Sequence, residues 1–89
     1  MNEMIDEMEE GKRMLLEMVK SMDATVQVVI PVAPSNSRFL IALTKGLNRQ
    51  FITLSEDDIL DLPADAKVRA NVTKVLNEAM TALETRQSG

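Results

Sequence analysis

The spacing of apolar residues changes twice along this chain of 89 residues, from a helical period to an alternating one and back. At the start of the chain, seven positions follow one another at alternating intervals of three and four, the a/d pattern of an amphipathic helix. These positions are Met1, Met4, Met8, Gly11, Leu15, Met18 and Met22. The pattern predicts a helix over residues 1–22, in which Gly11 marks either a bend or a close approach to another backbone.

In the middle of the chain the apolar residues alternate with period two, which is typical of half-buried strands. Three such stretches, 25–32, 38–45 and 50–54, are separated by turn-forming residues at 34–37 and 46–48. Connections this short favour an antiparallel three-stranded meander. We predict that one face of this sheet, its inner face, holds Val26, Val28, Ile30, Phe39, Ile41, Leu43, Ile52 and Leu54. A register error of one residue would exchange these residues for the opposite set.

A helical period returns in the last third of the chain. Ser55 is followed three residues later by Asp58, which is typical of a helix N-cap and predicts a short helix over 55–62. Apolar residues at helical spacing then predict a long helix over 64–85, with a polar tail over 86–89. The chain is therefore expected to form one α+β domain in the order helix, three strands, short helix, long helix, with both long helices on one face of the sheet.

The composition excludes most common catalytic and metal-binding chemistry. The chain has no cysteine and no histidine, which removes disulfides, thiolate nucleophiles, imidazole bases and the usual zinc ligands. Asp57, Asp58 and Asp61 have a spacing that could hold Mg²⁺, but the sequence has no second acidic motif to complete such a site. A role in starting a helix explains these acids more simply. We expect a protein that is not an enzyme and binds no metal and no cofactor.

The charges form blocks rather than an even mixture. Residues 1–23 carry seven acids and three bases, whereas residues 24–55 carry three bases and no acid. Those three bases, Arg38, Lys45 and Arg49, make a nucleic-acid-binding hairpin the alternative hypothesis for function. Nucleic acid is the less favoured partner, because the acidic first helix would repel phosphates and the chain has no tryptophan or tyrosine for base stacking.

Six of the seven methionines lie within the first 22 residues. Methionine is flexible and polarizable, so a stripe of it forms either core packing or an adaptable surface for a protein partner. A helix of this length extends about 30 Å, more than a small sheet covers. We therefore predict that its first half binds a partner. The residues of this predicted surface are Met1, Met4, Ile5, Met8 and Gly11.

The resulting hypothesis is a small non-enzymatic protein–protein interaction module that acts as an adaptor, an inhibitor or a secretion-chaperone-like protein. Its partner is a second copy, in a homodimer, or another protein. The acidic start of the chain lacks the features of a secretory signal, and no apolar run is long enough to span a bilayer. A cytoplasmic location without membrane contact is therefore expected.

Overall fold

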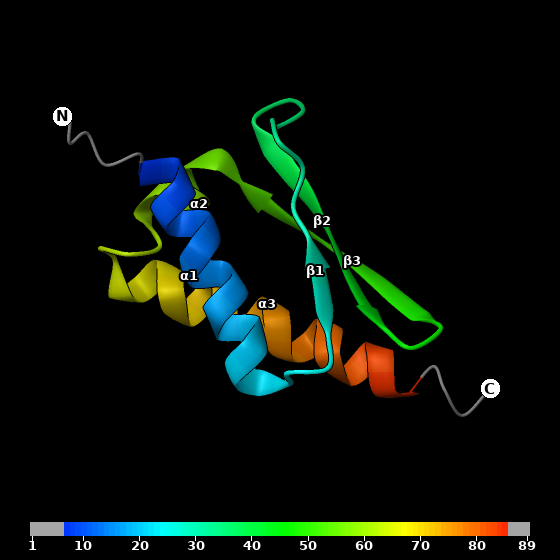
Figure 1. Ribbon diagram of the computed structural model, residues 1–89. Coiled ribbons are helices and arrows are strands. Elements are labelled where there is room, and N and C mark those ends of the chain that lie inside the picture. The colour runs from blue at the N-terminus through cyan, green and yellow to red at the C-terminus, as the bar shows by residue number, and fades with distance from the viewer. Residues whose placement is uncertain (1–6, 86–89) are drawn as a thin grey trace, which may run out of the picture.

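The computed structural model describes residues 7–85, which form three helices and three strands (Figure 1). In chain order these are α1 (Glu7–Met22), β1 (Gln27–Val29), β2 (Arg38–Lys45), β3 (Asn48–Ser55), α2 (Glu56–Asp61) and α3 (Ala66–Thr85). This confirms the predicted α+β fold and the order of its elements. The outer parts of two predicted segments, residues 1–6 of the first helix and the tail 86–89, lie outside the described residues.

The three strands form an antiparallel sheet in the order β1-β2-β3. Gly46 and Leu47 make the two-residue turn between β2 and β3, and Gly46 adopts the positive φ of +61° that such a turn needs. Because the turn is this short, pairing begins at once between Lys45 and Asn48. The strand β3 is therefore longer than the predicted 50–54, whereas β2 has its predicted bounds.

The first strand is shorter than predicted, since β1 spans three residues instead of the whole of 25–32. Pro31 has no N–H to give to a ladder, which ends regular pairing there. The carbonyl oxygens of Pro31 and Val32 instead accept hydrogen bonds from Lys12 Nζ of α1, at 3.5 and 3.3 Å. A predicted eight-residue strand thus becomes a short edge strand followed by a loop that α1 holds.

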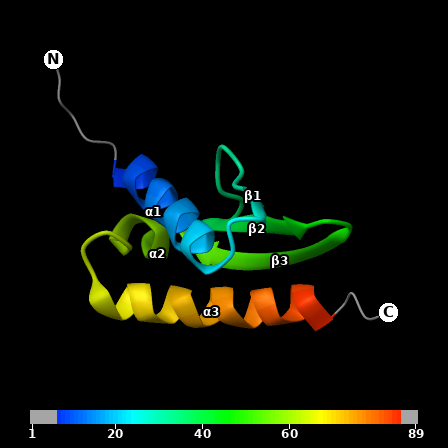
Figure 2. The same ribbon diagram turned by 60° about the horizontal axis from the view of Figure 1, so that its bottom comes forward.

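Both long helices lie on the same side of the sheet, and α3 runs along β3 (Figures 1 and 2). Leu15 and Val19 of α1 join Val72 and Leu76 of α3 in one buried core with the inner face of the sheet. The predicted register is confirmed. The inner-face residues that are buried are Val26, Phe39, Ile41, Leu43, Ile52 and Leu54. The other two, Val28 and Ile30, are only half-buried.

The two later helices begin at capping side chains. Ser55 Oγ accepts a hydrogen bond from the backbone N–H of Asp58 at 3.1 Å, which confirms the predicted N-cap of α2. Asp65 plays the same part for α3, because its Oδ1 accepts from the N–H of Lys67 at 2.9 Å. This cap sets the start of α3 at Ala66, two residues later than predicted.

Candidate functional site

Helix α1 is packed much more closely against α2 than against β1. Gly11 is buried against α2, and a methyl group added at this position would overlap the carbonyl oxygen of Ile59. Of the two predicted roles of this glycine, the close backbone approach is therefore confirmed. Only a residue without a side chain allows the two helices to lie at this distance.

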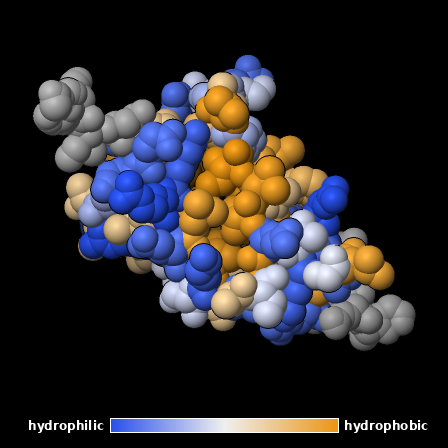
Figure 3. All heavy atoms as spheres, viewed as in Figure 1, coloured by the Kyte–Doolittle hydropathy of each residue, from blue (hydrophilic) through white to orange (hydrophobic). Residues whose placement is uncertain are grey.

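On its other side, α1 leaves an open groove against β1, which we call the α1–β1 groove. It consists of two adjoining hollows of about 300 and 440 Å³ that share Leu16 and Val28. Figure 3 shows an apolar surface there, between the hydrophilic surface of α1 and β1. The first hollow is lined by Glu9, Lys12, Arg13, Leu16, Val28 and Ile30, and the second continues toward Lys20 and Ala24.

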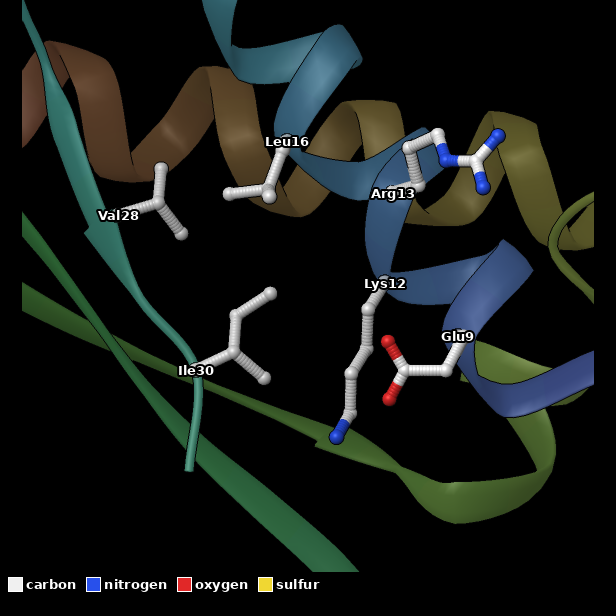
Figure 4. A pocket seen from close by; sticks show the side chains of 6 residues that line it. All are labelled: Glu9, Lys12, Arg13, Leu16, Val28 and Ile30. Atoms are coloured by element: carbon white, nitrogen blue, oxygen red, sulfur yellow. The ribbon is translucent and has the colours of Figure 1, made fainter. Parts of the chain in front are cut away.

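The floor of the groove is made of aliphatic side chains from both of its walls. Figure 4 shows Leu16 pointing from α1 toward Val28, with Ile30 beside them. Leu16 is 41% exposed, whereas its neighbour Leu15 is fully buried in the core. The Leu16 side chain thus leaves the space between α1 and β1 partly open.

Lys12 holds one end of the groove in place. Besides its hydrogen bonds to the loop after β1, its Nζ lies 5.1 Å from the centre of the Phe39 ring, within the range of a cation–π contact. The Lys12 side chain thus connects α1 to the loop and to the core below it.

The charges of α1 are divided between its two sides. Lys12, Arg13 and Lys20 lie on the side of the groove, together with one acid, Glu9. Figure 4 shows the Arg13 guanidinium extending away from Leu16, Val28 and Ile30. Neither Arg13 nor Lys20 has an ion pair with another described residue. The groove therefore has an apolar floor and a rim with net positive charge.

The structure separates the five residues predicted to bind a partner. Met8 packs against the core and Gly11 against α2, so both are occupied within one copy of the chain. The other three, Met1, Met4 and Ile5, lie outside the described residues. The open groove thus lies on a different side of α1 from the methionine stripe.

The three cations of the alternative, nucleic-acid-binding hypothesis do not form a cluster. Lys45 follows the inner-face parity of β2, whereas Arg38 and Arg49 follow the outer one. Arg49 pairs with Thr44, six residues along β2 from Arg38, which corresponds to about 20 Å. No continuous phosphate-binding surface results from this arrangement.

Lys45 is also engaged in an ion pair with Asp23, at 2.7 Å between Nζ and Oδ2. The hydrogen bond from Lys45, followed by those from the hydroxyl and N–H of Thr25, holds the pKa of Asp23 well below its usual value. The same hydrogen bond raises the pKa of Lys45. The pair ties the residue after α1 to the end of β2, at the end of the groove opposite Lys12.

The acidic residues of α2 form a helix start in the structure. Asp57 and Asp58 lie in its first turn, after the Ser55 cap, and Asp61 is its last residue. Residues 7–85 contain no group of three or more potential ligands that could hold a metal ion. In the same part of the chain, no helix is both long and apolar enough to cross a membrane.

A second apolar surface lies on the outer face of the sheet. Val29, Ala42 and Phe51 are register partners across the three strands, and Leu40 lies next to them. Leu40 is 57% exposed and Phe51 is 50% exposed. Arg38 and Arg49 follow the parity of this face as well, but they lie about 20 Å apart along the strands.

Comparisons with protein-family models, with curated proteins and with solved structures found no match to this chain. Sequence reasoning missed the groove residues of α1, although their spacing contains a signal. Glu9, Lys12 or Arg13, Leu16 and Lys20 follow one another at intervals of three or four, so that these five residues lie on one side of a helix.

Proposed function

We propose that this protein is a non-enzymatic protein–protein interaction module that associates with itself through the α1–β1 groove. The observation that carries the proposal is the open apolar floor with its cationic rim. Leu16, Val28 and Ile30 stay in contact with water in a single copy, although the hydrophobic effect favours their burial. An adaptor or inhibitor role would follow from the same surface.

The chemistry of the groove favours a protein side chain over a small metabolite. Small-molecule sites place a few fixed polar groups around an apolar cavity, so that the ligand is held in one orientation. Here the floor is aliphatic and the polar groups are long, flexible side chains at the rim. Such a surface suits apolar side chains that enter the groove from a chain passing over it.

The proposal is tested by the mass of the protein in solution, measured by sedimentation velocity from micromolar to millimolar concentration. Wild type should associate as the concentration rises. Leu16→Glu should weaken this association ~10-fold or more, because it places a carboxylate on the apolar floor. Leu40→Glu is the matched control, since Leu40 is an exposed leucine on the outer face of the sheet.

The control should associate like the wild type, and both variants should keep the circular dichroism spectrum of the folded chain. A wild type that stays monomeric over the whole range would contradict self-association. Loss of association in Leu40→Glu but not in Leu16→Glu would assign the interface to the outer face of the sheet instead.

A further inference from the structure

We propose that each α1–β1 groove receives residues Met1–Asp6 of a second copy, so that two chains exchange these segments. This inference deepens the proposed function and depends on it. It names the occupant of the groove as a particular segment of this chain. The chemistry of the segment, its point of attachment to α1 and the charges of the groove carry the argument.

The segment and the groove are complementary in both apolar and charged groups. Residues 1–6 contain Met1, Met4 and Ile5 as apolar side chains and Glu3 and Asp6 as acids, without any base. The aliphatic floor of the groove matches the apolar side chains of the segment. The cations at the rim of the groove match its two acids.

Two cations at the rim are available for such contacts. Arg13 and Lys20 are exposed and have no ion pair with another described residue. Each could turn toward a carboxylate without breaking an ion pair within residues 7–85. Methionine and isoleucine side chains in the groove would at the same time cover Leu16.

The length of the segment favours a second copy over the same chain. Ile5 lies two residues before Glu7, the first residue of α1, so it reaches at most about 7 Å from that residue. Leu16 lies nine residues further along α1, about 14 Å away. The chain would also have to reverse its direction. Ile5 therefore cannot cover Leu16 in the middle of its own groove, whereas the Ile5 of another chain can.

An exchange between two copies also closes on itself. Each chain carries one segment and one groove, so a two-fold axis lets both grooves be filled and leaves no site open for further growth. The proposal thus predicts a dimer rather than a fibre. It also gives the predicted partner-binding residues Met1, Met4 and Ile5 a place to bind other than a helix–helix seam.

The decisive experiment is a charge exchange between segment and groove, read by sedimentation velocity on full-length chains. One variant reverses the groove, Arg13→Glu with Lys20→Glu, and the other reverses the segment, Glu3→Lys with Asp6→Lys. Each alone should associate ~10-fold or more weakly than wild type, because like charges face each other in both of its sites. An equimolar mixture should form heterodimers, since both sites are then complementary again.

The matched control for the groove variant is Lys67→Glu with Lys74→Glu, which makes the same change in net charge on exposed positions of α3. This control should associate nearly as well as the wild type. Circular dichroism of every variant reports whether the chain stays folded. Weaker association of wild type at high salt is expected as well.

The outcomes separate this inference from the proposed function. If the mixture fails to recover association, or if both reversed variants associate like the wild type, the segment does not occupy the groove and the inference is wrong. A loss of association in Leu16→Glu alone would then still support the interaction module. If wild type is monomeric throughout, the proposed function fails, and the inference fails with it.

Discussion

The two sides of α1 differ in how closely they approach the rest of the chain. On one side, Gly11 brings the helix so near to α2 that no side chain fits between them. On the other side, Leu16 faces β1 across a groove that its side chain does not fill. Within one helix of 16 residues, one side is thus fixed by backbone contact and the other is left open.

One amphipathic helix can therefore pack into the core on one side and form an open groove on the other. The buried positions of α1 hold the helix in the core, and they include Leu15 and Val19. The adjacent positions that line the groove carry the cations and the half-exposed Leu16. Because the closed side fixes the helix, the open side can present a groove of constant shape to a partner.

A large loss of stability is expected on the closed side of α1, from Gly11→Ala. The added methyl group would overlap the Ile59 carbonyl oxygen, so α1 and α2 must move apart. Overpacking of this kind costs about 3 kcal/mol when the obstacle is backbone, against which the gain in helix propensity is small. Urea denaturation measures the loss. Glu17→Ala, at an exposed position of the same helix, should change stability by less than about 0.5 kcal/mol, and equal effects would show that the helices can separate freely.

Substitutions of two neighbouring leucines allow a direct comparison of the closed and the open side of α1. Leu15→Ala should cost roughly 2–5 kcal/mol in the free energy of unfolding of the single chain, because Leu15 is fully buried. Leu16→Ala should cost about 1 kcal/mol or less at concentrations where the chain is monomeric, since Leu16 remains 41% exposed. Chemical denaturation at low protein concentration checks both. Similar losses in the two variants would mean that the groove is closed in solution.

A smaller and pH-dependent effect is expected from Asp23→Asn, which removes the ion pair at one end of the groove. The lowered pKa of Asp23 means that the pair stabilises the fold above the ordinary value of 3.8 and that this stabilisation is lost as the pH falls through and below that value. The raised pKa of Lys45 means that stabilisation is present below 10.5 and is lost as the pH rises above it.

The difference in Tm between wild type and Asp23→Asn should therefore be greatest between those two values and should narrow at both extremes of pH. Lys45→Gln should lower the Tm by a similar amount, because it removes the same ion pair. Adding Asp23→Asn to Lys45→Gln should lower the Tm little further. A difference that stays constant from acid to alkaline pH would show that the pair does not form in solution.

Most of the fold could be predicted from the sequence, because the period of the apolar residues changes wherever the structure changes. The buried face of the sheet was also predicted correctly from the alternation of Phe39, Ile41 and Leu43, although Leu40 and Ala42 make the opposite face of β2 partly apolar as well. The bounds of β1, in contrast, could not be predicted from the sequence. The hydrogen bonds from Lys12 that hold Pro31 and Val32 join residues far apart in the sequence, and no local pattern shows them.

The site was harder to predict than the fold. Val28 and Ile30 fit the pattern of core residues, and only the distance between α1 and β1 turns them into the wall of a groove. Gly11 lies on the apolar stripe of the first helix, so the sequence could not tell a contact with α2 from a contact with a partner. The cations of the hairpin looked like one group, although the alternation along β2 and β3 places Lys45 on the opposite face from Arg38.

The central claim, that the open side of α1 binds a second copy, is tested most directly by NMR on the uniformly labelled full-length chain. Amide shifts are compared between micromolar and millimolar protein. We expect the amide shifts to change at residues 1–6, on the groove side of α1 around Leu16, and at Val28 and Ile30, with little change at Leu40 and Phe51. Changes centred on Leu40 and Phe51, or no change over this range, would contradict the claim.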